Sequence, residues 1–105
     1  MIQFTTVPES HQVSVEMDSS ALDAYVGRYA WTSGLVNTIS REGGKLMSQW
    51  RATGSKSEQL ALNDSTFFAR DDLGVVIFKK DNAGRVTHYI YRRPDGQEFK
   101  ANRIP

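Results

Sequence analysis

The chain contains no cysteine, and it has only three prolines and two histidines in 105 residues. Without cysteine there is no disulfide framework, no thiolate metal site and no cysteine nucleophile. The histidines, His11 and His88, stand far apart in the sequence and supply at most half of a metal site. No run approaches the roughly 18 apolar residues that a membrane span requires. We therefore expect no metal, no cofactor and no membrane insertion.

The chain also lacks a strong excess of charge of either sign. Its formal net charge is +1, although acids outnumber bases from Met1 to Gly44 and the last third, from Lys79 onward, is mildly basic. Basic residues with interleaved aromatics, as in HYIYRR (88–93), suit a single-stranded nucleic acid or an acidic partner. Because the lysines and arginines mostly alternate with apolar residues, they are more typical of the solvated outer faces of strands. We expect no nucleic-acid partner.

The chain starts with MIQFTTVPESHQ, which lacks both the basic start and the apolar core of a secretory signal. We expect a cytoplasmic location for the chain as given, and a periplasmic or extracellular one if it is a segment of a longer exported protein. A length of 105 residues suits one domain with its own core and is too short for two. We predict a single domain over residues 1–105, with residues 1–10 as a candidate loose tail.

What the sequence does contain is a succession of short alternating or apolar runs separated by turn residues. The expected strands are GRYAW (27–31), LVNTISR (35–41), KLMSQWR (45–51), EQLAL (58–62), TFFAR (66–70), VVIFKK (75–80), RVTHYIYR (85–92) and QEFKANR (97–103), with QVSVE (12–16) as a further candidate. Connections this short make neighbours in sequence neighbours in the sheet. The strands then close into a small barrel or fold over as a sandwich, since an open sheet would leave two exposed edges. We predict an all-β up-and-down barrel of about eight antiparallel strands with one short N-terminal helical turn.

The helical turn is expected just before the first strand, in the segment LDAYVGRYA (22–30). Ser20 followed by Asp23 has the spacing of a capping box, and Leu22, Tyr25 and Val26 form an apolar stripe at helical spacing. Gly27 stands where a left-handed glycine commonly ends a helix. We expect this turn to cover one open end of the barrel, where the core would otherwise contact water.

Five segments together resemble a known family: LDAYVGRYA, EGGKLM, STFFA, VIFKKDNAGRVTHY and ANRIP. In order and spacing they are similar to DUF3471, a small β-domain of unknown function that is usually attached to the C-terminal side of serine β-lactamase-like and other hydrolases. The resemblance covers the chain from about Leu22 to Pro105. It implies a lipocalin-like β-barrel and an accessory role beside a hydrolase domain, and it brings no established catalytic residues.

Serine-hydrolase chemistry has no recognisable motif in the chain. Neither Ser-x-x-Lys nor Gly-x-Ser-x-Gly occurs, and the serines of SSAL, SGL and GSKS stand in turns and caps without a base beside them. Asp71 and Asp72 are adjacent, so they point apart and do not form the facing carboxylate pair of glycosidases. We expect that the chain is not an enzyme and has no catalytic residues.

Aromatic residues at alternate strand positions are the candidate ligand-binding groups. Tyr29 and Trp31 share one strand face, and barrels that bind small apolar ligands line their cavity with such residues and one or two polar anchors. His88 is predicted to share a face with Val86 and Ile90, either inside the barrel or beside a partner strand. The candidate ligand-binding residues are Tyr29, Trp31, Trp50, Phe78, His88, Ile90 and Arg92, with His88 or Arg92 as the anchor.

Two functional hypotheses follow from these observations. The leading one is a non-catalytic accessory or interaction module that docks on a hydrolase domain or another protein, as a monomer or dimer. The alternative is a lipocalin-like carrier of a small apolar ligand. The two differ in the barrel interior, because a carrier needs a cavity of about 300 Å³ or more. We expect a filled interior, since the short strands are rich in Leu, Ile, Phe and Trp.

Overall fold

The computed structural model describes residues 18–50, 54–69 and 73–105. Outside the described residues lie His11, the candidate tail at 1–10, the candidate strand at 12–16, Asp71 and Asp72. One helical turn, α1 (Ser19–Leu22), continues into the 3-10 turn η3 (Asp23–Tyr25). The strands are β1 (Gly27–Trp31), β2 (Val36–Glu42), β3 (Lys45–Gln49), β4 (Ser57–Ala61), β5 (Thr66–Ala69), β6 (Val75–Lys80), β7 (Val86–Arg92) and β8 (Glu98–Ile104). Within the described ranges, no helix is long and apolar enough to cross a membrane.

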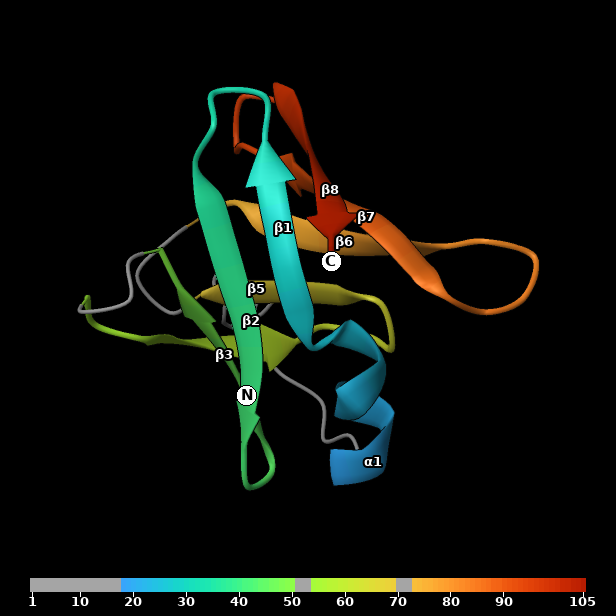
Figure 1. Cartoon of the computed structure of the whole chain (residues 1–105). Helices are drawn as coiled ribbons and strands as arrows, with labels where there is room; N and C mark the ends of the chain where they lie inside the picture. The colour runs from blue at the N-terminus through green and yellow to red at the C-terminus, as the bar shows by residue number, and fades with distance from the viewer. Residues whose placement is uncertain (1–17, 51–53, 70–72) are drawn as a thin grey trace, which may run out of the picture.

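The strands form one closed barrel in sequence order. Each strand pairs with the next in antiparallel orientation, and β8 pairs back to β1. The closing pair places Arg28 opposite Ile104 and Trp31 opposite Ala101, and Figure 1 shows β1 beside β8. The short connections explain this strand order, because each is too short for the next strand to pair anywhere except beside the previous one. The predicted up-and-down barrel of eight antiparallel strands with one short helical turn is confirmed.

Alternate strand residues point into the barrel and form its core. The buried cluster consists of Leu22, Tyr25, Tyr29, Ile39, Leu46, Ala61, Phe67, Phe78, Val86, Tyr89 and Ala101. Complete burial of a Val, Leu, Ile or Phe side chain contributes about 1.5–3 kcal/mol relative to its exposure to water. These inward side chains therefore supply the main favourable term in the folding of the barrel.

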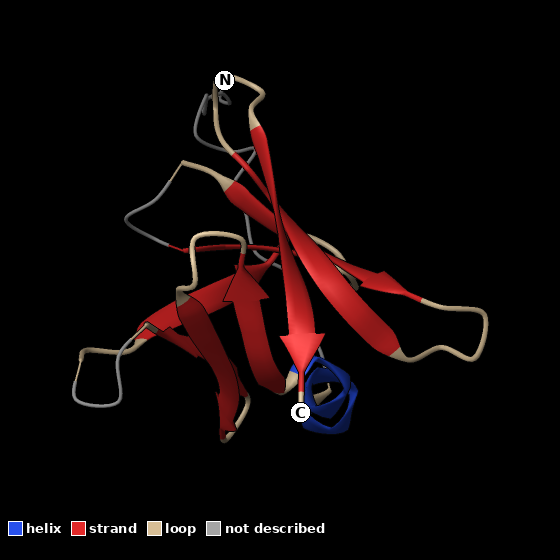
Figure 2. Ribbon diagram, turned by 45° about the horizontal axis from the view of Figure 1, so that its top comes forward, coloured by secondary structure: helices blue, strands red, loops and turns tan. Residues whose placement is uncertain are grey.

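The helical turn closes one end of the barrel, as the sequence predicts. Figures 1 and 2 show α1 at the end where β1 begins. Leu22 and Tyr25 are both buried in the core cluster. The Tyr25 ring stacks on Phe78 with centroids 4.5 Å apart, and its hydroxyl donates a hydrogen bond to the Asp64 carbonyl oxygen in the β4–β5 connection. The turn thus reaches both the core and the chain that follows β4.

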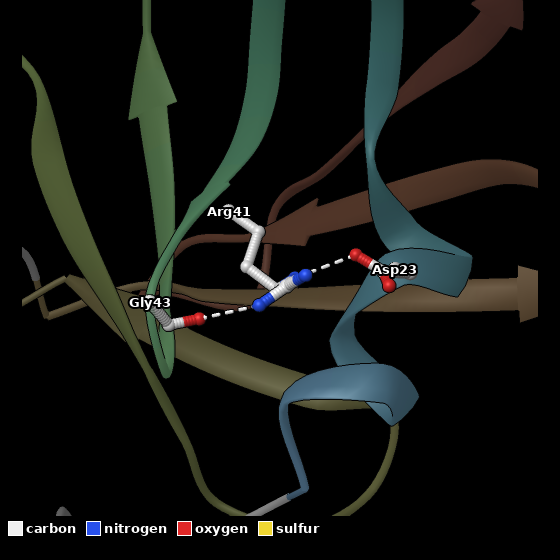
Figure 3. A network of polar contacts seen from close by, with 3 residues as sticks. All are labelled: Asp23, Arg41 and Gly43. Atoms are coloured by element: carbon white, nitrogen blue, oxygen red, sulfur yellow. Dashed lines mark hydrogen bonds and ion pairs between the residues drawn. The ribbon is translucent and has the colours of Figure 1, made fainter.

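The expected capping box is wrong. The residue before α1 is Asp18, and no side chain makes a capping hydrogen bond there. The Asp23 carboxylate instead accepts a hydrogen bond from Arg41 Nε at 2.6 Å, while Arg41 Nη1 donates to the Gly43 carbonyl at 2.8 Å (Figure 3). Asp23 therefore links the helical turn to the β2–β3 hairpin. Its carboxylate pairs with the Arg41 guanidinium because a hydrogen bond between two charged groups is stronger than one to a neutral backbone N–H.

The expected left-handed conformation of Gly27 is also wrong. The described glycines with positive φ are Gly34, Gly43, Gly84 and Gly96, whereas Gly27 is simply the first residue of β1. A Cβ atom on Gly27 would lie 2.8 Å from Arg103 Nε, well inside van der Waals contact. Arg103 holds this place because its Nη2 donates to the Val26 carbonyl at 2.6 Å and its Nη1 to the Val86 carbonyl at 3.3 Å. Glycine at position 27 thus allows the close approach of Arg103, and its role is not one of backbone handedness.

Candidate functional site

Aromatic rings fill the half of the barrel interior that lies next to α1. Around the Phe78 ring, Tyr25 lies 4.5 Å away between centroids, and Tyr29 and Phe67 each lie 5.6 Å away. The Tyr29 hydroxyl donates a 2.9 Å hydrogen bond to the Tyr25 carbonyl, and burial raises the pKa of Tyr29 to about 12, against the opposing effect of Arg103. In this half the predicted ligand-binding residues Tyr29 and Phe78 are packed core residues.

The other half of the interior contains a pocket of about 410 Å³. It lies at the end opposite α1, since Trp31 ends β1, Ala69 ends β5 and Gly74 immediately precedes β6. The lining comprises the aromatic and apolar residues Trp31, Trp50, Ala69, Gly74, Val76, Tyr89 and Tyr91 and the polar residues Asn37, Ser48, Ser57 and Gln59. The expectation of a filled interior is therefore correct near the helix and wrong at this end.

Small residues explain why space remains there. Ser48, Ser57 and Ala69 occupy lining positions on three successive strands, where larger apolar side chains would close the barrel. Gly74 has a different role, because a Cβ atom on it would lie only 2.6 Å from the Tyr91 ring and its hydroxyl. The absence of a side chain at Gly74 lets the Tyr91 ring, which lines the pocket, approach the backbone closely.

A chain of hydrogen bonds runs across the inner surface of the pocket. Trp31 Nε1 donates to the Tyr89 hydroxyl oxygen at 2.8 Å, and Asn37 Nδ2 donates to the same oxygen at 2.9 Å. The Ser48 hydroxyl donates to Asn37 Oδ1 at 2.8 Å. Asn37 and Ser48 are only 3% and 5% exposed. Two polar side chains are thus buried inside the barrel, where packing alone would favour apolar residues.

The Tyr89 phenol at the centre of this chain is neutral over the physiological range. Burial raises the pKa of Tyr89 above its usual value, while the hydrogen bonds from Asn37 and Trp31 lower it in the opposite direction. Since an unperturbed tyrosine already ionises only near pH 10, the hydroxyl keeps its proton at neutral pH. Tyr89 is therefore a neutral phenol, and not a phenolate, and its side chain is fully buried behind the pocket lining.

Gln59, on β4, contributes an unusual polar group to the lining. Its Oε1 atom is buried and has no hydrogen-bond partner within the described part of the chain. A buried acceptor without a partner costs about 1–3 kcal/mol, so most such atoms in proteins are satisfied. Gln59 Oε1 thus marks a position where the described residues supply no hydrogen-bond donor.

The entrance of the pocket is rich in apolar surface. The Trp31 ring lies 5.4 Å from Trp50 and 5.8 Å from Tyr91 between centroids, and it stacks on Phe99 at 5.6 Å. Trp50 is 44% exposed. Two further exposed apolar side chains, Leu35 (57%) and Leu73 (70%), lie in the connections after β1 and before β6, at the same end of the barrel. We call Leu35, Trp50 and Leu73 the apolar rim.

The structure separates the predicted ligand-binding residues into three groups. Trp31 and Trp50 line the pocket. Tyr29 and Phe78 belong to the filled core near the helix. His88, Ile90 and Arg92 lie on the outer face of β7, because Tyr89 and Tyr91 between them line the pocket and successive strand residues face opposite ways.

The position of His88 departs from the prediction for an identifiable reason. His88 is not on the face of Val86: Lys79 pairs with His88 and Lys80 with Val86, so Thr87 is an extra residue and the ladder has a bulge. Val86 points into the core while His88 points outward, where burial and then Lys100 and Lys79 lower its pKa. The other expected anchor, Arg92, pairs on the outer face with Glu98 at 2.7 Å.

The polar groups that the structure brings into the pocket are Asn37, Ser48, Ser57, Gln59 and Tyr89. A sequence signal existed for two of them: Asn37 alternates with the inward Ile39, and Ser48 alternates with the inward Leu46. Strict alternation would therefore have placed both inside the barrel. Gln59 likewise alternates with the inward Ala61, but Leu60 and Leu62 give this segment an apolar pattern on the opposite face, so the sequence alone favours the wrong side.

The comparison with known proteins agrees with the resemblance found in the sequence. No curated protein matches the chain at a significant level. A family model described as a domain of unknown function, DUF3471, matches residues 11–103. This match covers the helical turn, most of the barrel and all the described residues that line the pocket. The chain therefore belongs to the DUF3471 family.

Proposed function

We propose that this domain is a binding module that holds a small neutral molecule in the pocket at the open end of its barrel. The observation that carries the proposal is the polar chain from Trp31 through Tyr89 and Asn37 to Ser48, buried beside unfilled space. Polar groups and voids both cost stability in a protein interior. A barrel selected for packing alone would replace them with larger apolar side chains, so their presence supports a role in recognition.

The volume and lining of the pocket support this role. A volume of about 410 Å³ lies in the range of roughly 300–1,000 Å³ that is typical of small-molecule sites. Such sites combine aromatic walls with a few convergent polar groups, as Trp31, Tyr91 and Asn37 do here. The residues described around the pocket include no Asp, Glu, Lys, Arg or His. Among the described residues the pocket thus offers polar and aromatic contacts rather than a charged partner, which suits a neutral ligand.

The same lining supports binding without turnover. General acid–base catalysis needs a group whose pKa lies near the operating pH, and hydrolysis by a serine needs an adjacent base. Ser48 donates its hydroxyl hydrogen to an amide oxygen, and Ser57 has no imidazole or carboxylate beside it among the described lining residues. We expect nitrophenyl esters and nitrocefin to be hydrolysed no faster than in buffer. Turnover that a single serine substitution abolishes would overturn the non-catalytic proposal.

A titration with the neutral fluorescent probe N-phenyl-1-naphthylamine tests the proposed binding. We expect saturable binding with enhanced probe emission and a parallel change in the emission of Trp31 and Trp50, since both indoles line the pocket. Ser57→Leu should abolish binding, because the larger side chain fills the pocket without removing a member of the polar chain. The control is Ser40→Leu, which makes the same change on β2 at a position next to the inward Ile39 and therefore on the outer face. Unsaturable binding, or equal binding by both variants, would overturn the proposal.

An interaction module is the second candidate, and the apolar rim is the observation that favours it. Exposed side chains such as Leu35 and Leu73 at one end of a small barrel suit contact with a protein surface. The resemblance suggests that the partner is a hydrolase domain. A photo-crosslinking residue at Leu73 should then crosslink to a hydrolase-containing protein in cells, whereas the same residue at the exposed outer position Thr87 should not. Absence of that crosslink, or equal crosslinking from both positions, would count against this candidate.

A further inference from the structure

Phe68 on β5 is buried although it points away from the barrel interior. Its neighbour Phe67 belongs to the core cluster, and successive strand residues face opposite ways, so Phe68 lies on the outer face. Phe68 is nevertheless only 4% exposed, and it is the one buried apolar residue of the described chain that is absent from the core cluster. A side chain on the solvent side of a sheet keeps part of its surface in water unless another segment covers it. Some part of the molecule therefore covers Phe68 from outside the barrel.

Further apolar side chains surround Phe68 on the same face. Leu60 lies directly opposite Phe68 on β4, and Ile77 lies opposite Ile90 across β6 and β7. Val75 and Ile77 are alternate residues of β6, so they share one face. These four neighbours of Phe68 are half-buried. We call Leu60, Phe68, Val75, Ile77 and Ile90 the outer apolar patch.

The amino-acid sequence indicates which part of the chain can supply an apolar cover. Outside the described ranges, residues 51–53 (RAT) and 70–72 (RDD) are mainly polar or charged. The segment QVSVE (12–16) instead alternates Val13 and Val15 with polar residues, which gives an extended chain one apolar face. The family model also matches from residue 11 onward, so this segment belongs to the family domain. Residues 11–17 are therefore the best candidate for the cover.

The position of the helical turn lets this segment reach the patch. The Tyr25 hydroxyl donates to the Asp64 carbonyl oxygen, so the turn lies beside the β4–β5 connection (Figure 1). Phe68 is the third residue of β5, about 10 Å along the strand from that connection. Seven extended residues span about 23 Å. Residues 11–17, which lead into the turn, are thus long enough to cross the patch.

We infer that residues 11–17 form a strap across the outer face of β4, β5 and β6, with Val13 and Val15 packed on the outer apolar patch. The strands of the closed barrel already pair on both sides, so side-chain packing rather than strand pairing holds the strap. The polar residues that alternate with the two valines then face water. The strap also closes the patch to partners, and among the described residues the exposed large apolar side chains are those of the apolar rim.

Single cysteines test this inference, because the chain has no cysteine of its own. We expect the thiols of Val13→Cys and Val15→Cys to react with an aromatic disulfide reagent about tenfold or more slowly than that of Ser14→Cys, since only the packed positions need local opening. In urea the three rates should become equal. Adding Phe68→Ala to Val15→Cys should reduce the protection to less than about threefold. The matched control Ile104→Ala, which removes a half-buried outer side chain of β8, should leave it unchanged.

Equal rates at the three positions in the native protein would overturn the inference, and so would equal effects of the two alanine substitutions. A spin label covers the case in which Phe68→Ala does not fold. A nitroxide on Ser14→Cys should broaden the amide NMR signals of Leu60 and Phe68 more than that of Ala30 on β1, which lies across the barrel from β5. A ¹⁵N-labelled protein mixed with unlabelled, spin-labelled protein should show no such broadening. Broadening only in the mixed sample would assign the cover to a second copy, and no preferential broadening at Phe68 would place the segment elsewhere; either result would overturn the inference.

Discussion

Arg103 connects three parts of the chain that are far apart in sequence. Its guanidinium donates to the carbonyls of Val26, after the helical turn, and Val86, at the start of β7. It also occupies the space that a side chain at Gly27 would need. A guanidinium that is held by two carbonyls cannot move aside without loss of those hydrogen bonds. A single contact between β8 and β1 therefore decides which residue is tolerated at the first position of the barrel.

Replacing Gly27 by alanine should lower the free energy of unfolding by about 1–2 kcal/mol, because the new Cβ displaces the Arg103 guanidinium. The same change in an Arg103→Ala background should cost less than about 0.5 kcal/mol, since the clash has been removed. Urea denaturation of the four proteins measures this coupling. Equal costs in both backgrounds would mean that position 27 needs glycine for another reason.

Tyr29 makes the stability of the barrel sensitive to alkaline pH. Its pKa is raised to about 12 in the folded chain, against about 10 in an unfolded one, because the phenol is buried. The stabilising contribution is complete below pH 10 and is lost as the pH rises towards 12, since only the unfolded state releases the proton in that interval. We expect this residue to lower the free energy of unfolding by about 1.4 kcal/mol per pH unit there. Urea midpoints between pH 9 and pH 12 should fall more steeply for the native protein than for Tyr29→Phe.

At the scale of secondary-structure elements, we expect the helical turn to be held in place by the burial of its apolar side chains and not by its ion pair. Leu22 and Tyr25 are buried in the core cluster, whereas the Asp23–Arg41 pair has side chains 54% and 33% exposed. Exposed ion pairs contribute about 0–1 kcal/mol, because water and salt screen them. Loss of a buried leucine side chain costs about 2–5 kcal/mol.

We therefore expect Leu22→Ala to destabilise the domain by about 2–4 kcal/mol and Asp23→Ala by less than about 1 kcal/mol. The Asp23→Ala effect should shrink further in 1 M salt, where the remaining attraction to Arg41 is screened. Chemical denaturation at low and high salt measures both effects. A cost for Asp23→Ala that equals the cost for Leu22→Ala would show that the link to the β2–β3 hairpin is the dominant contact.

The interior of the whole molecule has a packed end and an end with unfilled space. The end next to α1 is packed with aromatic rings, while the opposite end keeps a pocket of about 410 Å³ and the buried polar pair Asn37 and Ser48. Unfilled volume forfeits dispersion contacts, so the pocket end is the less stable part of the barrel.

Ser57→Leu should raise the free energy of unfolding by about 0.5–2 kcal/mol, because the added carbon atoms fill empty space and bury apolar surface. The same variant is expected to lose ligand binding. Thermal melts with and without N-phenyl-1-naphthylamine should show a higher Tm for the variant alone and a ligand-induced shift only for the native protein. A lower Tm in the variant would indicate that the space is already occupied by tight packing.

Local patterns in the sequence were sufficient for the architecture of this protein. The alternation in segments such as 27–31 and 66–70, with short turns between them, predicts strands that pair in sequence order, and eight such strands close to remove their edges. The apolar spacing of Leu22 and Tyr25 likewise predicts the helical turn at one end. These features depend on residues that are near one another in the chain, so the periodicity of the sequence carries them.

Only the tertiary structure decided the site. One extra residue, Thr87, turns His88 away from the face of Val86, and no repeat in the sequence marks that bulge. The role of Gly27 depends on Arg103, and the polar chain joins Trp31, Asn37 and Ser48 to Tyr89 across the barrel. Whether the interior is filled depends on the summed volume of side chains from every strand, because a cavity is a property of the closed barrel and not of any single segment.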